Sequence, residues 1–479
     1  MTQTIYRPGL NGDENEEFTP NGGRVPRLSG DIRHLIPKLG LREYWFPLCG
    51  VNRVKKNKPM RVRMLGEDLC VFRGASKGEI HALTDICPHR GARLSEGDCH
   101  YAGTVSCPYH GWTFDGKGTN VAVLSEGPNS QVCGKPGTEA RAYPTQVLKG
   151  VVFVWMGDAE PAPIEEDVPE EFFNPQAYIL FNDRIYWKTN WEVALENSMD
   201  AHVQYLHRDN LSALLASNGI RIGAPIPGAR PVFTGNGFNG ESTPPPPPSG
   251  DGGDAYRQQA ELQATQNKRQ TSLFNVWPNG WRWPKHRYRT RWSWLGAPFF
   301  NLMQVASGPI KQSQLWGGGH HLPGLHRFAG QPARGPRTNP LVKLFTPGGS
   351  GLFGLYTRHT VPVDEWLTRT WYYHYMVPSN SLQKAWIWFN YVTWGRWSSE
   401  YNFSQQDMSV MLHQIYDASE KLSGTDAEVV QWRKLVVTKH FGGRDYPFEY
   451  ERQERAEALS APSSAVSNGN GLQRKNGDL

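Results

Sequence analysis

Short apolar runs, separated by glycine-rich turns, follow one another from residue 61 to residue 158. They are RVRMLGEDLCVFR (61–73), IHALTD (80–85), GTVSCP (103–108), GWTFDGKG (111–118) and GVVFVWMGD (150–158). Runs of this length bounded by Gly and Asp are typical of β-strands. The pattern therefore predicts a small antiparallel β domain over residues 41–160, preceded in residues 1–40 by an arm and a short helix near DIRHLIPKLG.

The pattern changes after a proline- and acid-rich connection, EPAPIEEDVPEEF. A helix is predicted around 190–215, long aromatic strands follow, and helices return between about 380 and 440. The proline run in GESTPPPPPSGDGGDAY (240–256) cannot hold a regular element, so we expect a flexible insertion at about 225–265. The fold class is thus predicted to be α+β. A larger domain over 161–455 would hold an antiparallel sheet covered by helices, followed by a disordered tail over 456–479.

Composition and charge narrow the class of protein. The chain has 479 residues, of which 38% are hydrophobic, enough for the cores of two domains. The net charge of +6 is dispersed, and the largest basic cluster, RWPKHRYRTRW (282–292), alternates as a strand does. A solvated or intersubunit strand face is the favoured interpretation and the docking of an acidic electron carrier is an alternative. Nucleic-acid binding is not expected.

The sequence shows no sign of membrane targeting. No run approaches the roughly eighteen apolar residues that a membrane span requires. The N-terminal stretch MTQTIYRPGLNGDENEEF also lacks the apolar segment of a signal peptide. We therefore expect a cytoplasmic protein without stable membrane insertion.

Two short segments each offer one cysteine and one histidine. They are Cys87-x-His89 and Cys107-x-x-His110, with seventeen residues between His89 and Cys107. A structural zinc site usually takes Cys pairs spaced two to four apart, or a Cys pair followed by a His pair. One soft and one borderline ligand from each segment instead favours a Rieske-type [2Fe–2S] cluster, in which one iron carries two cysteines and the other two histidines. Zinc, or residues without a metal, are the alternatives.

The surroundings of the two segments agree with this interpretation. Gly91 and Gly111 follow the two pairs and would let the backbone close around a cluster. All six cysteines lie within the first 133 residues, so sulfur chemistry is confined to the N-terminal domain. The other four, at positions 49, 70, 99 and 133, show no ligand pattern and are interpreted as buried or surface thiols.

A second candidate metal site lies in NWEVALENSMDAHVQYLHRDN (190–210). His202 and His207 stand five residues apart, with Asp200 and Glu196 close by. Two imidazoles and one carboxylate form the facial triad of mononuclear Fe(II) oxygenases. However, residues five apart on a regular helix point about 140° from each other, so convergence requires local widening of the helix. Surface or core histidines are therefore the alternative interpretation of the pair alone.

The first pair of segments resembles the Rieske proteins closely. Respiratory Rieske proteins carry an extra cysteine in each loop and link the loops by a disulfide. The corresponding positions here hold Ala92 and Tyr109, so the resemblance is to the soluble ferredoxins and the ring-hydroxylating oxygenases. A ferredoxin is complete in about a hundred residues, so the rest of this chain must supply another function.

Taken together, the motifs resemble the large (α) subunit of Rieske non-haem iron oxygenases over most of residues 41–440. LREYWFPLCG, the Rieske motif, KGVVFVWMGD, NWEVALENSMDAHVQYLHRD and LSGTDAEVVQWRKL look most like the homotrimeric branch that includes the carbazole and 2-oxoquinoline oxygenases. The resemblance implies that Asp407, in NFSQQDMSVM, is the third iron ligand beside His202 and His207. It also implies that Asp200 orients a ligand histidine and touches a cluster histidine of the next subunit. Asn197 and Asp200, in the same segment, are the candidate catalytic residues.

One departure from the family pattern concerns the first histidine. Family members place the bridging Asp three residues before it, whereas only Ala201 separates Asp200 from His202. The Asp200–His207 spacing equals that of the carbazole branch, so His202 has moved by one place and Met199 occupies the usual bridging position. The departure leaves open how Asp200 contacts His202.

The resemblance implies a terminal oxygenase that uses O2 and two metal centres, a [2Fe–2S] cluster and mononuclear Fe(II). Electrons would come from a separate ferredoxin or NAD(P)H-dependent reductase, since the chain has no dinucleotide-binding fingerprint. The substrate would be a small apolar or aromatic molecule. Hydroxylation and oxidative O- or N-demethylation remain alternatives, as does an electron-transfer protein that lacks a working mononuclear iron.

Two other stretches have more than one interpretation. KAWIWFNYVTWGRW (384–397) is apolar almost around a helix, which favours a buried helix over a substrate-channel wall or a lipid-contacting surface. His320, His321 and His326 in GGGHHLPGLHRF suggest loop histidines near a pocket entrance, with a second metal site as the less favoured alternative.

Overall fold

The structure of the protein is a computed structural model. It describes residues 16–18, 24–26, 33–200, 202, 206, 228–234, 237–243, 319–328, 356–376, 378, 380–392, 396, 400–401, 404–416, 418–423 and 426–439. The basic cluster at 282–292, the tail and residues 244–265 of the predicted insertion lie outside these residues. The first part of that insertion was wrongly predicted to be flexible, since Gly228–Thr234 and Gly237–Thr243 are paired strands. Of the helix predicted around 190–215, the described part is helical over Trp191–Glu196, with turns at residues 197–199 directly after it.

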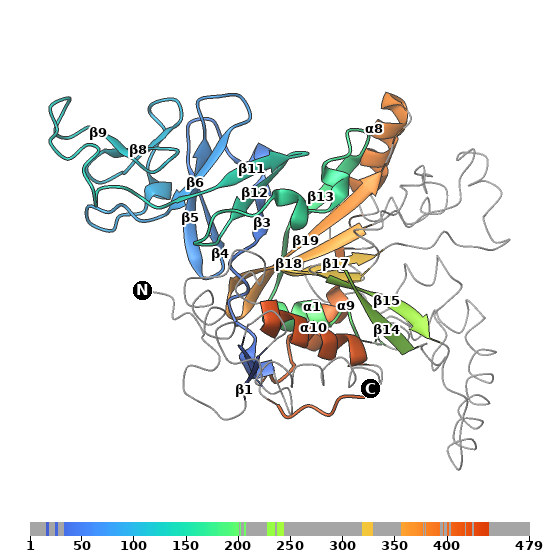
Figure 1. Cartoon of the computed structure of the whole chain (residues 1–479). Coiled ribbons are helices and arrows are strands. Elements are labelled where there is room, and N and C mark those ends of the chain that lie inside the picture. Colours follow the sequence, from blue (N-terminus) through green and yellow to red (C-terminus); the bar gives the residue numbers. More distant parts are fainter. Residues whose placement is uncertain are drawn as a thin grey trace, which may run out of the picture.

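Three small antiparallel sheets form the N-terminal part of the chain (Figure 1). The first has the order β10-β6-β5-β4, with β4 at Met60–Met64, β5 at Glu67–Arg73, β6 at Ile80–Thr84 and β10 at Ala142–Tyr143. The second has the order β11-β12-β3, with β3 at Trp45–Gly50, β11 at Thr145–Leu148 and β12 at Val151–Trp155. The third has the order β7-β8-β9, with β7 at Thr104–Ser106, β8 at Trp112–Asp115 and β9 at Asn120–Val123.

The strands predicted from the apolar runs are all present. The run at 61–73 is divided into β4 and β5 by a tight turn, because Leu65 and Gly66 adopt φ of 47° and 77°. Residues of β12, VVFVW, are buried on both faces, as their continuous apolar pattern indicates. The short helix predicted near residues 31–40 is a single 3-10 turn at Arg33–Leu35, and β1 (Glu16–Phe18) pairs with β2 (Arg24–Pro26) before it.

A seven-stranded antiparallel sheet forms the centre of the rest of the chain. Its order is β13-β19-β18-β17-β16-β15-β14. The strands are β13 (Tyr178–Trp187), β14 (Gly228–Thr234), β15 (Gly237–Thr243), β16 (Gly319–His321), β17 (Leu325–Phe328), β18 (Tyr356–Asp364) and β19 (Leu367–Met376). The predicted α+β class is confirmed: this sheet is covered by helices and preceded by the smaller all-β part.

The two faces of this sheet have different neighbours (Figure 1). On one face, Phe46 of β3 packs against His359 with ring centroids 5.8 Å apart, and Phe181 packs against Trp371 beneath the N-terminal sheets. The other face is covered by α1 (Trp191–Glu196), α9 (Ser404–Met411) and α10 (Ala427–Lys439). The candidate iron ligands lie on this helical face.

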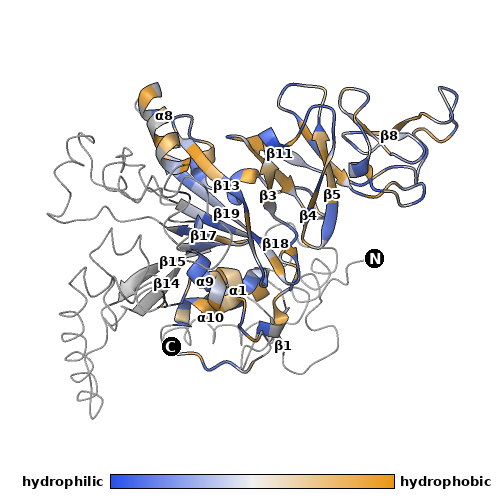
Figure 2. Cartoon of the chain, turned by 180° about the vertical axis from the view of Figure 1, so that it is seen from behind, coloured by the Kyte–Doolittle hydropathy of each residue, from blue (hydrophilic) through white to orange (hydrophobic). Residues whose placement is uncertain are grey.

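Two further predictions about local structure need correction. The stretch at 384–397 begins within a helix, α8 (Ser381–Asn390), which carries apolar residues at the edge of the structure (Figure 2). This helix is not buried, because Trp388 and Phe389 are 52% and 42% exposed. The histidines at 320, 321 and 326 do not lie in a loop but in β16 and β17, because the turn Leu322–Gly324 folds GGGHHLPGLHRF into a hairpin. Among the described residues, no helix has the length and apolar character needed to cross a membrane.

Candidate metal centres

The loops that carry the Cys–His pairs have the same backbone closure. In the first, the Cys87 N–H donates to Ala92 O (2.8 Å) and the Gly91 N–H donates to Cys87 O (2.9 Å). In the second, the Cys107 N–H donates to Trp112 O (2.8 Å) and the Gly111 N–H donates to Cys107 O (3.1 Å). Each cysteine is therefore held at the start of a turn that returns to it four residues later.

Glycine is needed where each turn closes. Gly91 and Gly111 have φ of 74° and 67°, a region in which other residues are strained. A Cβ on Gly111 would also lie 2.6 Å from Cβ of Leu124. The predicted role of these glycines, close approach of the backbone around a cluster, agrees with the turn geometry.

The four candidate cluster ligands lie together. The rings of His89 and His110 are 4.6 Å apart, and Cys87 hydrogen-bonds Cys107. This hydrogen bond, with backbone N–H groups of residues 109 and 110, lowers the pKa of Cys107 to about 6, and the pKa of Cys87 is raised. Two thiols and two imidazoles side by side fit the donor set of a Rieske cluster.

The sulfur and nitrogen sides of this set have different surroundings. Cys87 and Cys107 are buried, whereas His89 is exposed and His110 is partly exposed. The His89 ring stacks on Trp112, with centroids 4.9 Å apart and planes 5° apart. The histidine edge therefore faces solvent, where another protein can approach it, while the cysteine edge faces a core.

The first loop is supported by a buried carboxylate, Asp85, that no motif in the sequence indicates. Asp85 accepts hydrogen bonds from the N–H and Oγ of Ser95, both at 2.7 Å. Arg93 reaches both Asp85 and Asp68. All six cysteines are free thiols, in agreement with the prediction that Ala92 and Tyr109 leave the loops without a disulfide.

The second site begins at the end of α1. The Asn190 side chain accepts from the Glu192 N–H and so caps the helix start, and Asn197 follows the last helical residue. Beyond it, Asp200 Oδ1 contacts Nδ1 of His202. Nε2 of His202 lies 3.2 Å from Oδ1 of Asp407, which comes from α9 and is 2% exposed. Asp200 thus contacts His202 despite the shifted histidine, through the ring nitrogen that faces away from Asp407.

The charges around His202 favour a cation. Although burial lowers the pKa of His202, its hydrogen bonds with Asp200 and Asp407 raise that pKa to about 9. Asn197 Nδ2 also lies 3.5 Å from Asp407 Oδ1. Nε2 of His202 and the buried Asp407 carboxylate, side by side, are a nitrogen and an oxygen donor that fit Fe(II).

His207, the remaining predicted ligand, lies outside the described residues. Within the part of the chain that the structure describes, no three His, Cys, Asp or Glu side chains gather around a single ion position. The described part of the site therefore holds His202 and Asp407 as the two candidate ligands. Met199, at the position where the family has its bridging Asp, is buried in the apolar core.

A buried ion-pair network holds α1 in place, and sequence reasoning missed it. Arg433 of α10 donates to both Glu196 oxygens at 2.6 and 2.8 Å. Arg33 donates to Glu192 (3.2 Å), and Glu420 accepts from both arginines. Burial raises the pKa of Glu192 to about 8. Glu192 and Glu196, four residues apart on an otherwise apolar helix, are the signal that could have indicated buried cationic partners.

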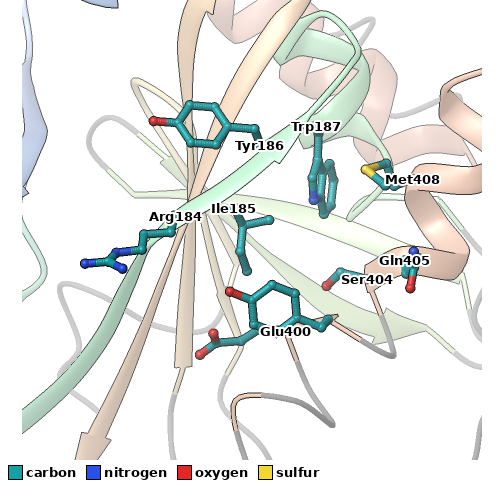
Figure 3. A pocket seen from close by; sticks show the side chains of 9 residues that line it. Arg184, Ile185, Tyr186, Trp187, Glu400, Ser404, Gln405 and Met408 are labelled. Carbon is teal, nitrogen blue, oxygen red and sulfur yellow. The ribbon is translucent and has the colours of Figure 1, made fainter. Parts of the chain in front are cut away.

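A small pocket, with a volume of about 30 Å³, lies between β13 and α9 (Figure 3). Its walls are Arg184, Ile185, Tyr186, Trp187, Glu400, Tyr401, Ser404, Gln405 and Met408. The space is sufficient for a water molecule but not for an aromatic substrate. Among the described residues, the pocket therefore belongs to the packing of α9.

Comparisons with known proteins identify two parts of the chain. Residues 44–132 match the Rieske [2Fe-2S] domain, and residues 155–231 match the homotrimeric ring hydroxylase family. Over 188 residues the chain is 33% identical to the terminal oxygenase component of carbazole 1,9a-dioxygenase from Metapseudomonas resinovorans, covering 39% of this chain and 48% of that protein. It is also 33% identical over 188 residues to the 4beta-methylsterol monooxygenase of Methylococcus capsulatus, covering 38% and 49%. The matched segment thus spans about half the length of these relatives.

The fold extends the similarity beyond this segment. The structure superposes on the terminal oxygenase of carbazole 1,9a-dioxygenase from Nocardioides aromaticivorans IC177 with a TM-score of 0.57 and 22% identity, covering 86% of this chain and 97% of that one. The chain thus has a Rieske [2Fe–2S] domain followed by a ring-hydroxylase domain and is homologous to the carbazole-type terminal oxygenases.

Proposed function

We propose that the chain is the terminal oxygenase component of a multicomponent Rieske oxygenase that hydroxylates a small apolar or aromatic substrate. The observation that supports this most strongly is the presence of two separate donor sets in one chain. Cys87, Cys107, His89 and His110 would hold the cluster, and His202, His207 and Asp407 would hold the mononuclear iron. Bound there, the metals would supply electron storage and dioxygen activation.

The chain's own residues would orient and protect these centres. The two turns closed by Gly91 and Gly111 set the positions of the sulfur ligands. Asp200 would fix the orientation of the His202 ring through Nδ1 and leave Nε2 toward the metal. Asn197 would orient the Asp407 carboxylate by donating a hydrogen bond from Nδ2 to Oδ1. Water exclusion follows from burial, because Asp407 is 2% exposed.

Electrons would come from a ferredoxin or an NAD(P)H-dependent reductase in the cytoplasm. The exposed His89 edge gives such a partner access to the cluster. Two of the solved structures whose oxygenase resembles this chain in fold are complexes of the carbazole 1,9a-dioxygenase oxygenase with ferredoxin. Oxidative O- or N-demethylation is the alternative reaction, since it would use the same iron.

The functional unit is proposed to be a homotrimer. The strands of the cluster loops, β7 to β9, lie at the far end of the N-terminal sheets from α1 and α9 (Figure 1). A neighbouring chain would bring its cluster beside Asp200 through a head-to-tail contact that closes into a ring. Sedimentation should give a trimer, and a fully active monomer would contradict the proposal.

Iron analysis under anaerobic conditions tests the proposed activity. An oxygenase should hold about three iron atoms per chain, two in the cluster and one in the mononuclear site. An electron-transfer protein that lacks the mononuclear iron should hold about two. Oxygen consumption with a surrogate reductase, measured across a panel of apolar and aromatic compounds, would then identify the substrate class.

A further inference from the structure

One row of polar side chains crosses the face of the large sheet that supports α1 and α9. The register of the strands places its members directly opposite one another, and directly opposite residues of antiparallel strands share a face. In order from β13 to β16 they are Asn182, Tyr372, Arg358, His326 and His320.

The row contacts both segments that lead to candidate iron ligands. On the side of the first segment, Arg358 donates to the Ala194 carbonyl of α1, and His320 hydrogen-bonds Ser198 at 3.1 Å. On the side of the second, the Tyr372 and Ser404 hydroxyls are 2.5 Å apart at the first residue of α9. The sheet therefore sets the spacing of the two segments.

Glu400 is the strongest of these connections. Its side chain is completely buried, and it lies seven residues before Asp407. It accepts hydrogen bonds from Asn182 Nδ2 (2.6 Å), His374 Nε2 (2.8 Å) and the Tyr391 hydroxyl (2.7 Å). A carboxylate out of contact with water needs such donors, and three donors from separate parts of the chain fix it in one place.

A small pocket borders the start of α9. The small pocket lies on this side, between Ile185 and Trp187 of β13 and Met408 of α9 (Figure 3). Nε2 of Gln405, in the first turn of α9, has no hydrogen-bond acceptor among the residues that the structure describes. The polar contacts of Glu400 and Tyr372 add to the apolar packing of Met408 and Met411 in restraining this turn.

We propose that Glu400 is a positioning residue for the mononuclear iron site. By fixing the start of α9, its carboxylate sets where Asp407 meets His202. The proposal rests on the iron site described under Proposed function. Glu400 does not touch the metal in this arrangement, and it acts only through the helix that carries the ligand.

Substitution Glu400→Gln tests the proposal at nearly constant size. The new amide turns an N–H group towards groups that donate hydrogen bonds to the Glu400 carboxylate. At least one hydrogen bond is therefore lost, and we expect α9 to shift. Co(II) is a suitable probe, because the oxidised cluster is silent in electron paramagnetic resonance and Co(II) in the mononuclear site is not. We expect at least a tenfold weaker Co(II) affinity and a changed Co(II) spectrum, with an unchanged cluster absorption spectrum.

Glu171→Gln is the matched control. Glu171 is also a buried carboxylate, but it pairs with Arg327, whose position in β17 next to His326 places it on the opposite face of the sheet. The control variant should bind Co(II) as the unsubstituted protein does. Equal Co(II) affinity and an unaltered spectrum in Glu400→Gln would overturn the proposal.

Two further outcomes are distinguishable. If the unsubstituted protein binds no Co(II) or Fe(II) beyond its cluster, the proposed mononuclear site itself is wrong. If Glu400→Gln also loses its cluster spectrum, the substitution has disturbed folding, and Tyr391→Phe then decides. This smaller change removes only one hydrogen bond from Glu400 and should still change the Co(II) spectrum; an unchanged spectrum would refute the positioning role.

Discussion

Nε2 of His202 lies 3.2 Å from Oδ1 of Asp407, although the two residues come from opposite ends of the catalytic region. Asp200 occupies the other ring nitrogen of His202. The two carboxylates are thus placed differently: Asp407 is buried and faces Nε2 of His202, whereas Asp200 is partly exposed and faces Nδ1.

Removal of the two carboxylates should therefore have different effects. Asp407→Ala should empty the mononuclear site and abolish product formation while the cluster spectrum is kept, because a ligand contributes charge to metal binding itself. Asp200→Asn should keep both metals and lower electron transfer between them by about tenfold or more, as expected for a residue that orients a ligand. Iron content and single-turnover reoxidation of the prereduced cluster measure the two effects. The assignment is wrong if Asp200→Asn loses the iron and Asp407→Ala turns over normally.

Loss of a cluster ligand should be a local event. Cys107→Ser or His89→Ala should abolish the Rieske absorption bands, whereas circular dichroism and oligomer size should remain those of the folded protein. The reason is that Cys107 belongs to a core of its own, together with Cys87 and Trp112, apart from the main core. A cluster spectrum that survives either substitution would exclude the four-ligand assignment.

Acid should destabilise the large sheet. Burial lowers the pKa of His359 to about 3, and burial with the nearby Arg327 charge lowers that of His321 to about 3. An unfolded histidine titrates near pH 6.5, so between these values the unfolded chain binds protons that the folded chain does not. The free energy of unfolding therefore keeps its full value above about pH 6.5. It falls as the pH decreases towards 3, by about 1.4 kcal/mol per pH unit for each histidine.

His359→Phe tests this dependence, because a phenylalanine ring can pack on Phe46 and cannot be protonated. Urea unfolding followed by tryptophan fluorescence between pH 4 and pH 8 should show a shallower decline for the variant. An identical slope in both proteins would contradict the prediction.

The ion pairs that hold α1 should contribute strongly to stability. Arg433→Met leaves Glu196 buried without its guanidinium partner and should lower the free energy of unfolding by about 3–5 kcal/mol. Arg61→Met is the comparison, since its pair with Asp68 is 43% exposed on the arginine side and should cost about 1 kcal/mol or less. Chemical denaturation of the two variants measures the difference, and equal losses would show that burial of the network is unimportant.

Local patterns determined how much of the fold could be predicted. The strands of the N-terminal sheets and the two Cys–His turns follow from short-range features, namely apolar runs and glycines at positive φ. The predicted domain boundaries stay predictions, because the apolar core around Trp45 also includes Trp371 and Trp432 from beyond residue 161. Tertiary contacts that cross a predicted boundary have no signature in the local sequence.

The site was predictable where it depends on motifs and not where it depends on distant partners. The resemblance named Asp407, and the structure places it beside His202. Nothing local to Glu400 or Arg433 indicates that their side chains meet residues more than two hundred positions away, as Asn182 and Glu196 are. Likewise, the glycines around His320 favour a loop, but pairing with β15 and β17 makes this stretch an interior strand.

The packing of β3 and β12 against the large sheet has a mechanical consequence. Because Trp45, Phe153, Trp371 and Tyr373 share one apolar core, and the N–H groups of Leu65 and Gly66 donate to residues 362 and 363 of β18, β3, β12 and the turn between β4 and β5 are fixed to the large sheet. The distance between the proposed cluster and the proposed iron site of the same chain would then vary little. Electron flow within an assembly then depends on how chains are arranged around one another, and a substitution at a contact between chains could stop turnover while both metals stay in place.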